Sequence, residues 1–128
     1  AEKTEEIWDE KIKVGLELMH ASMDDLIKLC NKYNIELTIV VYPHPGQIIY
    51  NDFDSFHVNH WKEFSEKNSI SFLNLFPLFF QPDLTKKEAI KIVNEYYIKN
   101  DYHFNINGNK IMTEGFLNFY KTSRKLKN

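Results

Sequence analysis

Residues 36–43, with the sequence ELTIVVYP, constrain the fold more than any other part of the chain. The run is rich in β-branched residues and almost wholly apolar, which is typical of a strand buried on both faces of a parallel sheet. Pro43 ends the run, because proline has no N–H to donate to a central ladder. We therefore predict an interior, parallel strand over residues 37–42, flanked by helices on both faces.

A long amphipathic helix is predicted immediately before this strand, over residues 5–33. Apolar side chains recur three and four positions apart, as on one face of a helix. They are Trp8, Ile12, Leu16, Met19, Met23, Leu26 and Cys30. Asn34 is a plausible stop for this helix. A helix followed at once by a buried strand is the repeating unit of an α/β sheet.

The rest of the chain predicts three more helices and one more strand. Ser55 is a favoured N-cap residue, and Thr85 with Glu88 has the form of a capping box. The predicted helices cover residues 55–67, 85–96 and 107–125, the strand covers 69–76, and loops cover 44–54 and 77–83. Two strands are few for a complete parallel sheet. We predict an α/β fold of three-layer α/β/α type with a mainly parallel sheet, flavodoxin-like, in which residues 1–128 form a single domain or an incomplete C-terminal part.

Composition excludes several classes of function. The net charge is −2, whereas proteins that bind nucleic acid usually carry a clear basic excess. No apolar run approaches the roughly 20 residues that a membrane-spanning helix needs. The single cysteine excludes an internal disulfide and a cysteine-rich zinc site.

Asp101 and His103 form the strongest candidate for chemistry, in the segment NDYHFNINGN. In extended backbone, residues two apart point to the same side. A carboxylate beside a histidine fixes the imidazole tautomer and stabilises the imidazolium formed when the other nitrogen takes a proton. Asn105 is a good N-cap for the last helix.

The segment YIKNDYHFNINGNKIMTEGF, residues 97–116, resembles the terminal block of the SGNH/GDSL hydrolase superfamily. Residues 31–48 and 68–79 are similar to the strand-containing segments that precede this block. The resemblance implies a serine esterase or O-acyltransferase that acts on acyl esters, with glycan esters as one candidate class. It also implies that His103 is the catalytic base, that Asp101 is its orienting acid, and that no metal or organic cofactor takes part.

The chain departs from the family pattern in two respects. The commoner family spacing is Asp-x-x-His, and this chain has Asp-x-His. The family's Gly-Asp-Ser nucleophile block and its oxyanion-hole blocks are not in this sequence. Asp54-Ser55 is a lookalike without the glycine, and we interpret Ser55 as a helix cap. The nucleophile is therefore expected outside this chain, which is expected to be inactive alone.

Other candidates keep two interpretations. His44 and Gln47, just after the first strand, would contact substrate or would belong to a proline-fixed turn. His57 and His60 are spaced to share one helix face, but a structural role is favoured over zinc binding. At the level of the whole chain, the alternative to an enzyme is a non-catalytic α/β module that binds a partner or completes a fold. A homo-oligomer formed through an exposed sheet edge is also expected.

Overall fold

The computed structural model describes the backbone of residues 2–125 and the side chains of residues 9–125. The chain divides into two compact units, Ala1–Leu37 and Thr38–Asn128. The first unit is dominated by α1 (Glu2–Lys32), which confirms the predicted long helix. The side chain of Trp8 lies outside the described residues.

Asn34 ends α1 in the left-handed conformation, with φ of 52°. Its N–H donates to the carbonyl of Asn31, and the N–H of Ile35 donates to the carbonyl of Cys30 at 2.8 Å. These two bonds form a Schellman motif, which satisfies carbonyl groups that the last turn leaves open. Asn51 after α2 and Ser69 after α3 have similar positive φ values, so the chain makes these turns without glycine.

The second unit contains a parallel pair of strands, β1 (Thr38–Val41) and β2 (Ser71–Asn74). Thr38 pairs with Ser71 and Val41 with Asn74. The prediction of parallel pairing is confirmed. The prediction of an interior strand is wrong for the described residues, because β1 has β2 as its only neighbour in the sheet. The first three residues of β1 are accordingly half-buried, and only Val41 is fully buried.

Five helices surround this pair: α2 (Pro45–Ile49), α3 (Phe56–Lys67), α4 (Phe76–Phe79), α5 (Lys86–Tyr96) and α6 (Ile106–Lys125). The predicted helices α3, α5 and α6 are confirmed within one residue at each end. The short helix α2 falls where a loop was predicted, and α4 begins at the last residue of the strand predicted over 69–76 and continues into the predicted loop. Both have a proline in the first turn, where the missing N–H costs nothing. The architecture is a mixed α/β unit in which helix predominates.

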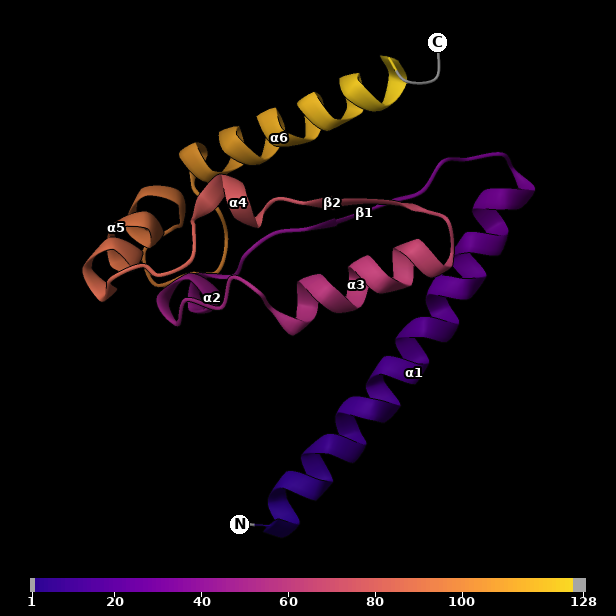
Figure 1. Cartoon of the computed structure of the whole chain (residues 1–128), viewed down its shortest axis with the longest axis horizontal. Coiled ribbons are helices and arrows are strands. Elements are labelled where there is room, and N and C mark those ends of the chain that lie inside the picture. The colour runs from indigo at the N-terminus through magenta and orange to yellow at the C-terminus, as the bar shows by residue number, and fades with distance from the viewer. Residues whose placement is uncertain (1, 126–128) are drawn as a thin grey trace. The chain divides into compact units, whose positions relative to one another are not determined.

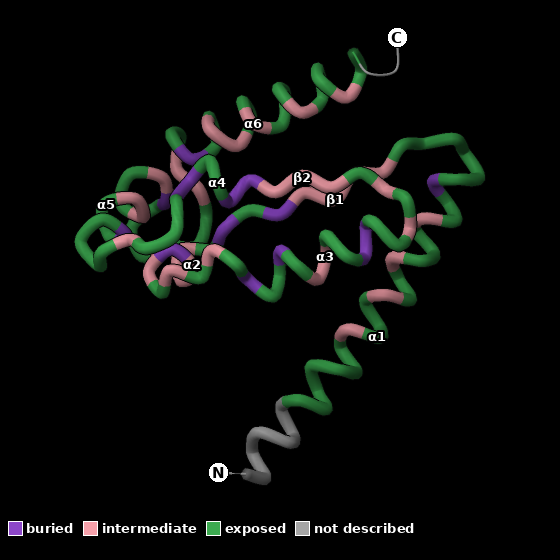
Figure 2. The backbone as a smooth tube through the Cα atoms, viewed as in Figure 1, coloured by how far each residue is buried: buried purple, intermediate pink, exposed green. Residues whose placement is uncertain are grey.

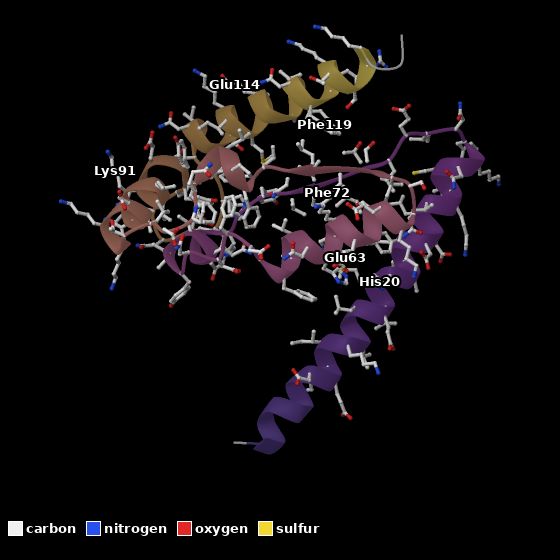
Figure 3. The ribbon with its side chains drawn as sticks, viewed as in Figure 1. His20, Glu63, Phe72, Lys91, Glu114 and Phe119 are labelled. Carbon is white, nitrogen blue, oxygen red and sulfur yellow. The ribbon has the colours of Figure 1, made fainter. Side chains whose placement is uncertain are left out.

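The sheet has helices on two sides. α3 packs against both strands, and α6 runs on the side opposite α3 (Figure 1). α6 approaches α4 closely at Gly115, where an added Cβ would strike the side chains of Leu75 and Leu78. Lys91 on α5 and Glu114 on α6 point into solvent (Figure 3). Among the described helices, none combines the length and the apolar character needed to cross a bilayer.

The core lies at the carboxyl ends of the strands. Buried stretches gather around the end of β1, α2 and α4 (Figure 2). The nine buried residues of this cluster are Val41, Ile48, Val58, Leu75, Phe76, Phe79, Phe80, Ala89 and Tyr97. The half-buried Phe104 stacks on Phe79 with ring centroids 5.0 Å apart. The loop that carries Asp101 and His103 is therefore anchored on the best-packed part of the unit.

Candidate functional site

The loop between α5 and α6 is a tight turn closed by backbone pairing. Tyr97 and Phe104 form an antiparallel bridge across its base. Inside it, the N–H of Ile98 donates to the carbonyl of His103, and the N–H of Asp101 donates to the carbonyl of Ile98, both at 3.0 Å. Asn100 takes the left-handed conformation that such a turn requires, with φ of 62°. The geometry of residues 98–103 is thus set by the backbone.

Asn105 joins this loop to the helices on either side. Its side-chain oxygen accepts from the N–H groups of Asn107 and Gly108 in the first turn of α6. Its side-chain amide donates to the carbonyls of Glu95 and Tyr97. The expected N-cap role is present, and the same side chain also closes the end of α5. One asparagine therefore fixes both ends of the loop.

Asp101 and His103 are hydrogen-bonded to each other, with 2.6 Å between Asp101 Oδ1 and His103 Nδ1. The same oxygen accepts from the backbone N–H groups of Tyr102 and His103. The bond from the His103 side chain, supported by these N–H groups, lowers the pKa of Asp101 below its ordinary value. An ionised Asp101 at Nδ1 assigns the ring proton to that nitrogen. Nε2 is then the nitrogen that can take a proton.

The His103 side chain is 81% exposed and that of Asp101 is 43% exposed. The His103 ring is therefore open to a partner from outside the loop. The sequence correctly predicted that the side chains of Asp101 and His103 are neighbours in space. Their catalytic role stays a prediction.

The loop lies beside the segment that directly follows β1. The hydroxyl of Tyr97 donates to the carbonyl of Pro43 at 2.6 Å. The ring centroids of Tyr102 and His44 are 4.7 Å apart. Those of Tyr42 and Phe104 are 5.4 Å apart. The Asp101–His103 loop therefore sits at the carboxyl end of β1, the edge where open α/β sheets bind ligands.

His44 and Gln47 form the capping box of α2. His44 Nδ1 accepts from the N–H of Gly46 at 3.2 Å, and the side-chain oxygen of Gln47 accepts from the N–H of His44 at 2.9 Å. The Gln47 amide also donates to Ser55 Oγ at 2.8 Å. Both residues thus stabilise the turn at Pro45. A role in substrate contact stays a prediction, and it would use the parts of these side chains that face outward.

Ser55 is the N-cap of α3, as interpreted from the sequence. It is 2% exposed, and its Oγ accepts from the N–H of His57. A hydroxyl that is buried and engaged in this way is a structural group. Ser55 therefore has no access to an ester carbonyl from solvent.

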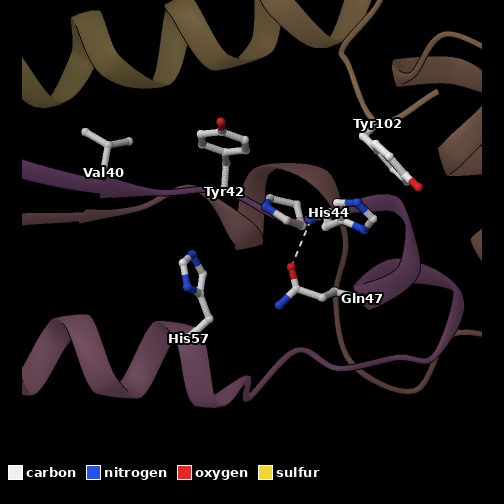
Figure 4. A pocket seen from close by; sticks show the side chains of 7 residues that line it. Val40, Tyr42, His44, Gln47, His57 and Tyr102 are labelled. Atoms are coloured by element: carbon white, nitrogen blue, oxygen red, sulfur yellow. Dashed lines mark hydrogen bonds between the residues drawn. The ribbon is translucent and has the colours of Figure 1, made fainter. Parts of the chain in front are cut away.

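Two hollows meet at the contact between His44 and Tyr102. The first has a volume of about 460 Å³ and is lined by Val40, Tyr42, Pro43, His44, Gln47, His57 and Tyr102. In Figure 4 the His57 side chain points from α3 toward β1, and the Tyr42 side chain leaves β1 on the side away from α3. The second has a volume of about 760 Å³ and extends from His44 to the end of α5 and to Asp101. Tyr102 borders both hollows and lies between Asp101 and His103 in the chain.

The hollow beside Tyr102 contains residues that sequence reasoning did not assign to it. His57 was weighed with His60 as a zinc ligand. In the part of the chain that the structure describes, no three His, Cys, Asp or Glu side chains gather closely enough to hold a metal ion. Partial burial, and to a smaller extent the nearby His60, lower the pKa of His57, which favours its neutral form. Tyr42 and Tyr102 carried no signal in the sequence beyond their position beside the candidate residues.

Comparison with protein-family models, with curated proteins and with solved structures gives no match for this chain.

Proposed function

We propose that Asp101 and His103 are the acid–base part of a serine esterase or O-acyltransferase of SGNH/GDSL type that acts on acyl esters. The observation that carries the proposal is the 2.6 Å bond between His103 Nδ1 and Asp101 Oδ1, at the carboxyl end of β1. In this proposal β1, β2, α3 and α6 belong to a three-layer α/β/α domain with a mainly parallel sheet. The rest of that sheet would come from a segment outside this chain.

The proposed reaction begins when a serine hydroxyl from that other segment attacks the ester carbonyl. His103 Nε2 takes the hydroxyl proton as the C–O bond forms, and Asp101 stabilises the resulting imidazolium. The imidazolium returns the proton to the oxygen of the leaving alcohol, and an acyl-serine remains. Water then releases the acyl group as an acid, or an acceptor hydroxyl takes it in a transferase. His103 serves as base for either acceptor, and the scheme needs neither a metal nor an organic cofactor.

The exposure of His103 fits a site in which this chain supplies the acid–base pair and another segment supplies the nucleophile. An imidazole acts best as a base where water is excluded and charge is held by fixed dipoles. A ring that is 81% exposed lacks such cover within the described residues. The proposed second segment would supply the nucleophile, the oxyanion donors and this cover together.

The test is hydrolysis of a short-chain acyl ester by the full-length protein that the gene encodes. His103→Ala is expected to abolish cleavage, and Asp101→Asn is expected to reduce it strongly but less completely, because the base remains in place. Glu114→Ala is the control, since this side chain points into solvent from α6. Circular dichroism checks that each variant is folded. Unchanged turnover in a folded His103→Ala protein would refute the proposed role.

A non-catalytic α/β module is the second candidate. It is favoured by Ser55, whose hydroxyl is buried in a helix cap. A serine-reactive fluorophosphonate separates the two candidates. Under the enzyme proposal it labels one serine of the full-length protein, and mass spectrometry locates that serine outside residues 1–128. A full-length protein that resists labelling and cleaves no ester would support the module.

A further inference from the structure

We propose that the hollow beside Tyr102 binds the ring of a neutral sugar. This tyrosine hollow has a volume of about 460 Å³ and is lined by Val40, Tyr42, Pro43, His44, Gln47, His57 and Tyr102. The binding claim stands on this lining alone. Its connection to catalysis rests on the function proposed above.

The charge of the lining excludes ionic ligands. None of the seven lining residues is Lys, Arg, Asp or Glu. Partial burial lowers the pKa of His57 and so favours the neutral form of that ring. A carboxylate or ammonium group that entered this hollow would lose hydration and gain no charged partner, which is unfavourable. The ligand that fits is uncharged.

Two aromatic rings offer flat apolar faces that are already held in place. Tyr102 is 72% exposed and lies against the His44 ring at 4.7 Å. Tyr42 is 49% exposed, and its ring centroid lies 5.4 Å from that of Phe104. Because these contacts limit rotation, little side-chain freedom is lost when a ligand covers the rings. Tyrosine combines such a face with a polar hydroxyl at its edge.

The polar groups of the lining suit hydroxyl partners. His44 Nδ1 accepts from Gly46, so the neutral ring carries its proton on Nε2 and can donate it. His57 and the two tyrosine hydroxyls can each donate and accept. A hydroxyl group can also do both, whereas a purely apolar ligand would leave these groups without partners. A pyranose ring has an apolar C–H face for tyrosine and a rim of hydroxyls for the imidazoles.

The volume of the tyrosine hollow lies within the range of about 300–1,000 Å³ for small-molecule sites. Tyr102 lies between Asp101 and His103 in the sequence. The second hollow, which shares His44 and Tyr102 with the tyrosine hollow, reaches Asp101, so a sugar on Tyr102 would have a path for its substituents toward that residue. In the proposed enzyme, the sugar would be the alcohol part of the ester or the acceptor of the acyl group.

The experiment is a titration of the ¹⁵N-labelled 128-residue chain, followed by amide chemical shifts. The probes are methyl β-D-glucopyranoside, the methyl glycoside of N-acetylglucosamine, glucuronate and p-cresol. Saturable shifts at the amides of Gln47, His57 and Tyr102 are expected with a neutral glycoside. Glucuronate should bind more weakly. Binding of p-cresol alone would overturn the assignment to sugars, as would a lack of saturable shifts with both glycosides.

Variants show whether the tyrosine hollow is the place of binding. Tyr102→Ala is expected to raise the Kd of the neutral glycoside roughly two- to tenfold, the value of an aromatic contact. Tyr102→Phe should stay close to wild type, because the ring face is kept. Tyr50→Ala is the matched control, since Tyr50 is 84% exposed and lies outside the lining. Equal effects of Tyr102→Ala and Tyr50→Ala would refute the site.

His57→Ala, which changes the opposite wall, should also weaken binding, and an unchanged Kd there would contradict the proposed lining. The assay needs no nucleophile, so its outcome is independent of the esterase test. Sugar binding together with unchanged ester cleavage by His103→Ala would keep this inference and reject the catalytic one. A lack of sugar binding together with loss of ester cleavage in His103→Ala would reject only the sugar site.

Discussion

Tyr97 donates its hydroxyl proton to the carbonyl of Pro43, a residue 54 positions earlier in the chain, at 2.6 Å. Tyr97 is 3% exposed, and Pro43 is among the fully buried residues. The bond joins the base of the Asp101–His103 loop to the segment after β1. The loop and the carboxyl end of the strand are therefore held together by a buried contact between distant parts of the sequence.

Tyr97→Phe is expected to destabilise the protein by about 1–3 kcal/mol, the cost of leaving a buried acceptor unpaired. Urea denaturation followed by circular dichroism measures the loss. Tyr50→Phe is the control, because Tyr50 is 84% exposed. Equal unfolding midpoints for the two variants would show that the bond contributes nothing.

The pKa of Tyr97 is raised far above its ordinary value, first by burial and then by the nearby Tyr42. A group whose pKa is higher in the folded state stabilises that state below its unfolded pKa, which is about 10 for tyrosine, and the contribution is lost as the pH rises further. We expect stability to fall above pH 10 less steeply in Tyr97→Phe than in wild type. The same denaturation series at alkaline pH measures this difference.

The ionisation of Asp101 makes the stability of the fold depend on pH in the opposite sense. Its lowered pKa means that the bond to His103 stabilises the fold above the ordinary carboxyl pKa of about 3.9, and this contribution is lost as the pH falls through the lowered value. In His103→Ala, the pKa of Asp101 is expected to rise toward its ordinary value. A ¹³C NMR titration of the Asp101 carboxyl group measures the change. An identical titration curve in the variant would mean that the side-chain bond is not formed in solution.

Two glycines are expected to respond to alanine in opposite directions. A Cβ at Gly108 would strike the carbonyl oxygen of Tyr96 and the ring of Phe104, so Gly108→Ala should destabilise by about 1–3 kcal/mol. Gly15 lies inside α1 with nothing within 4 Å of an added Cβ, so Gly15→Ala should favour the helix by about 0.5–1 kcal/mol. Chemical denaturation measures the free energy of unfolding of both variants and of the wild type. A neutral Gly108→Ala would contradict the close approach of α6 to α5.

Self-association is expected at high protein concentration. Within residues 2–125, β1 and β2 each lack a second neighbour in the sheet. An apolar hollow lies beside β1, lined by Val40, Tyr42, Leu75, Met112, Thr113 and Phe116. Open edges and apolar surface favour association. Sedimentation velocity should show a dimer that Phe116→Glu weakens and the surface change Lys121→Glu does not. A wild-type monomer at high concentration would argue against an open edge that pairs.

Local signals in the sequence predicted much of the secondary structure. The periodicity of α1, the Thr85–Glu88 capping box and the Ser55 cap depend on neighbours within a few positions, so they were readable in advance. The same holds for the bond between Asp101 and His103, which two-residue spacing allows. α2 was missed because its N-cap is a histidine in place of the usual serine or threonine, although Gln47 at N3 fits the capping-box pattern.

The sequence by itself determined the four longer helices α1, α3, α5 and α6, the parallel character of β1 and β2, and the pairing of Asp101 with His103. The tertiary structure decided how far β1 is buried, because burial depends on how many strands flank it and not on its own composition. It also decided which side chains line the tyrosine hollow. Tyr42, His57 and Tyr102 come from three segments, and only long-range contacts such as that of Tyr97 with Pro43 bring those segments to one place.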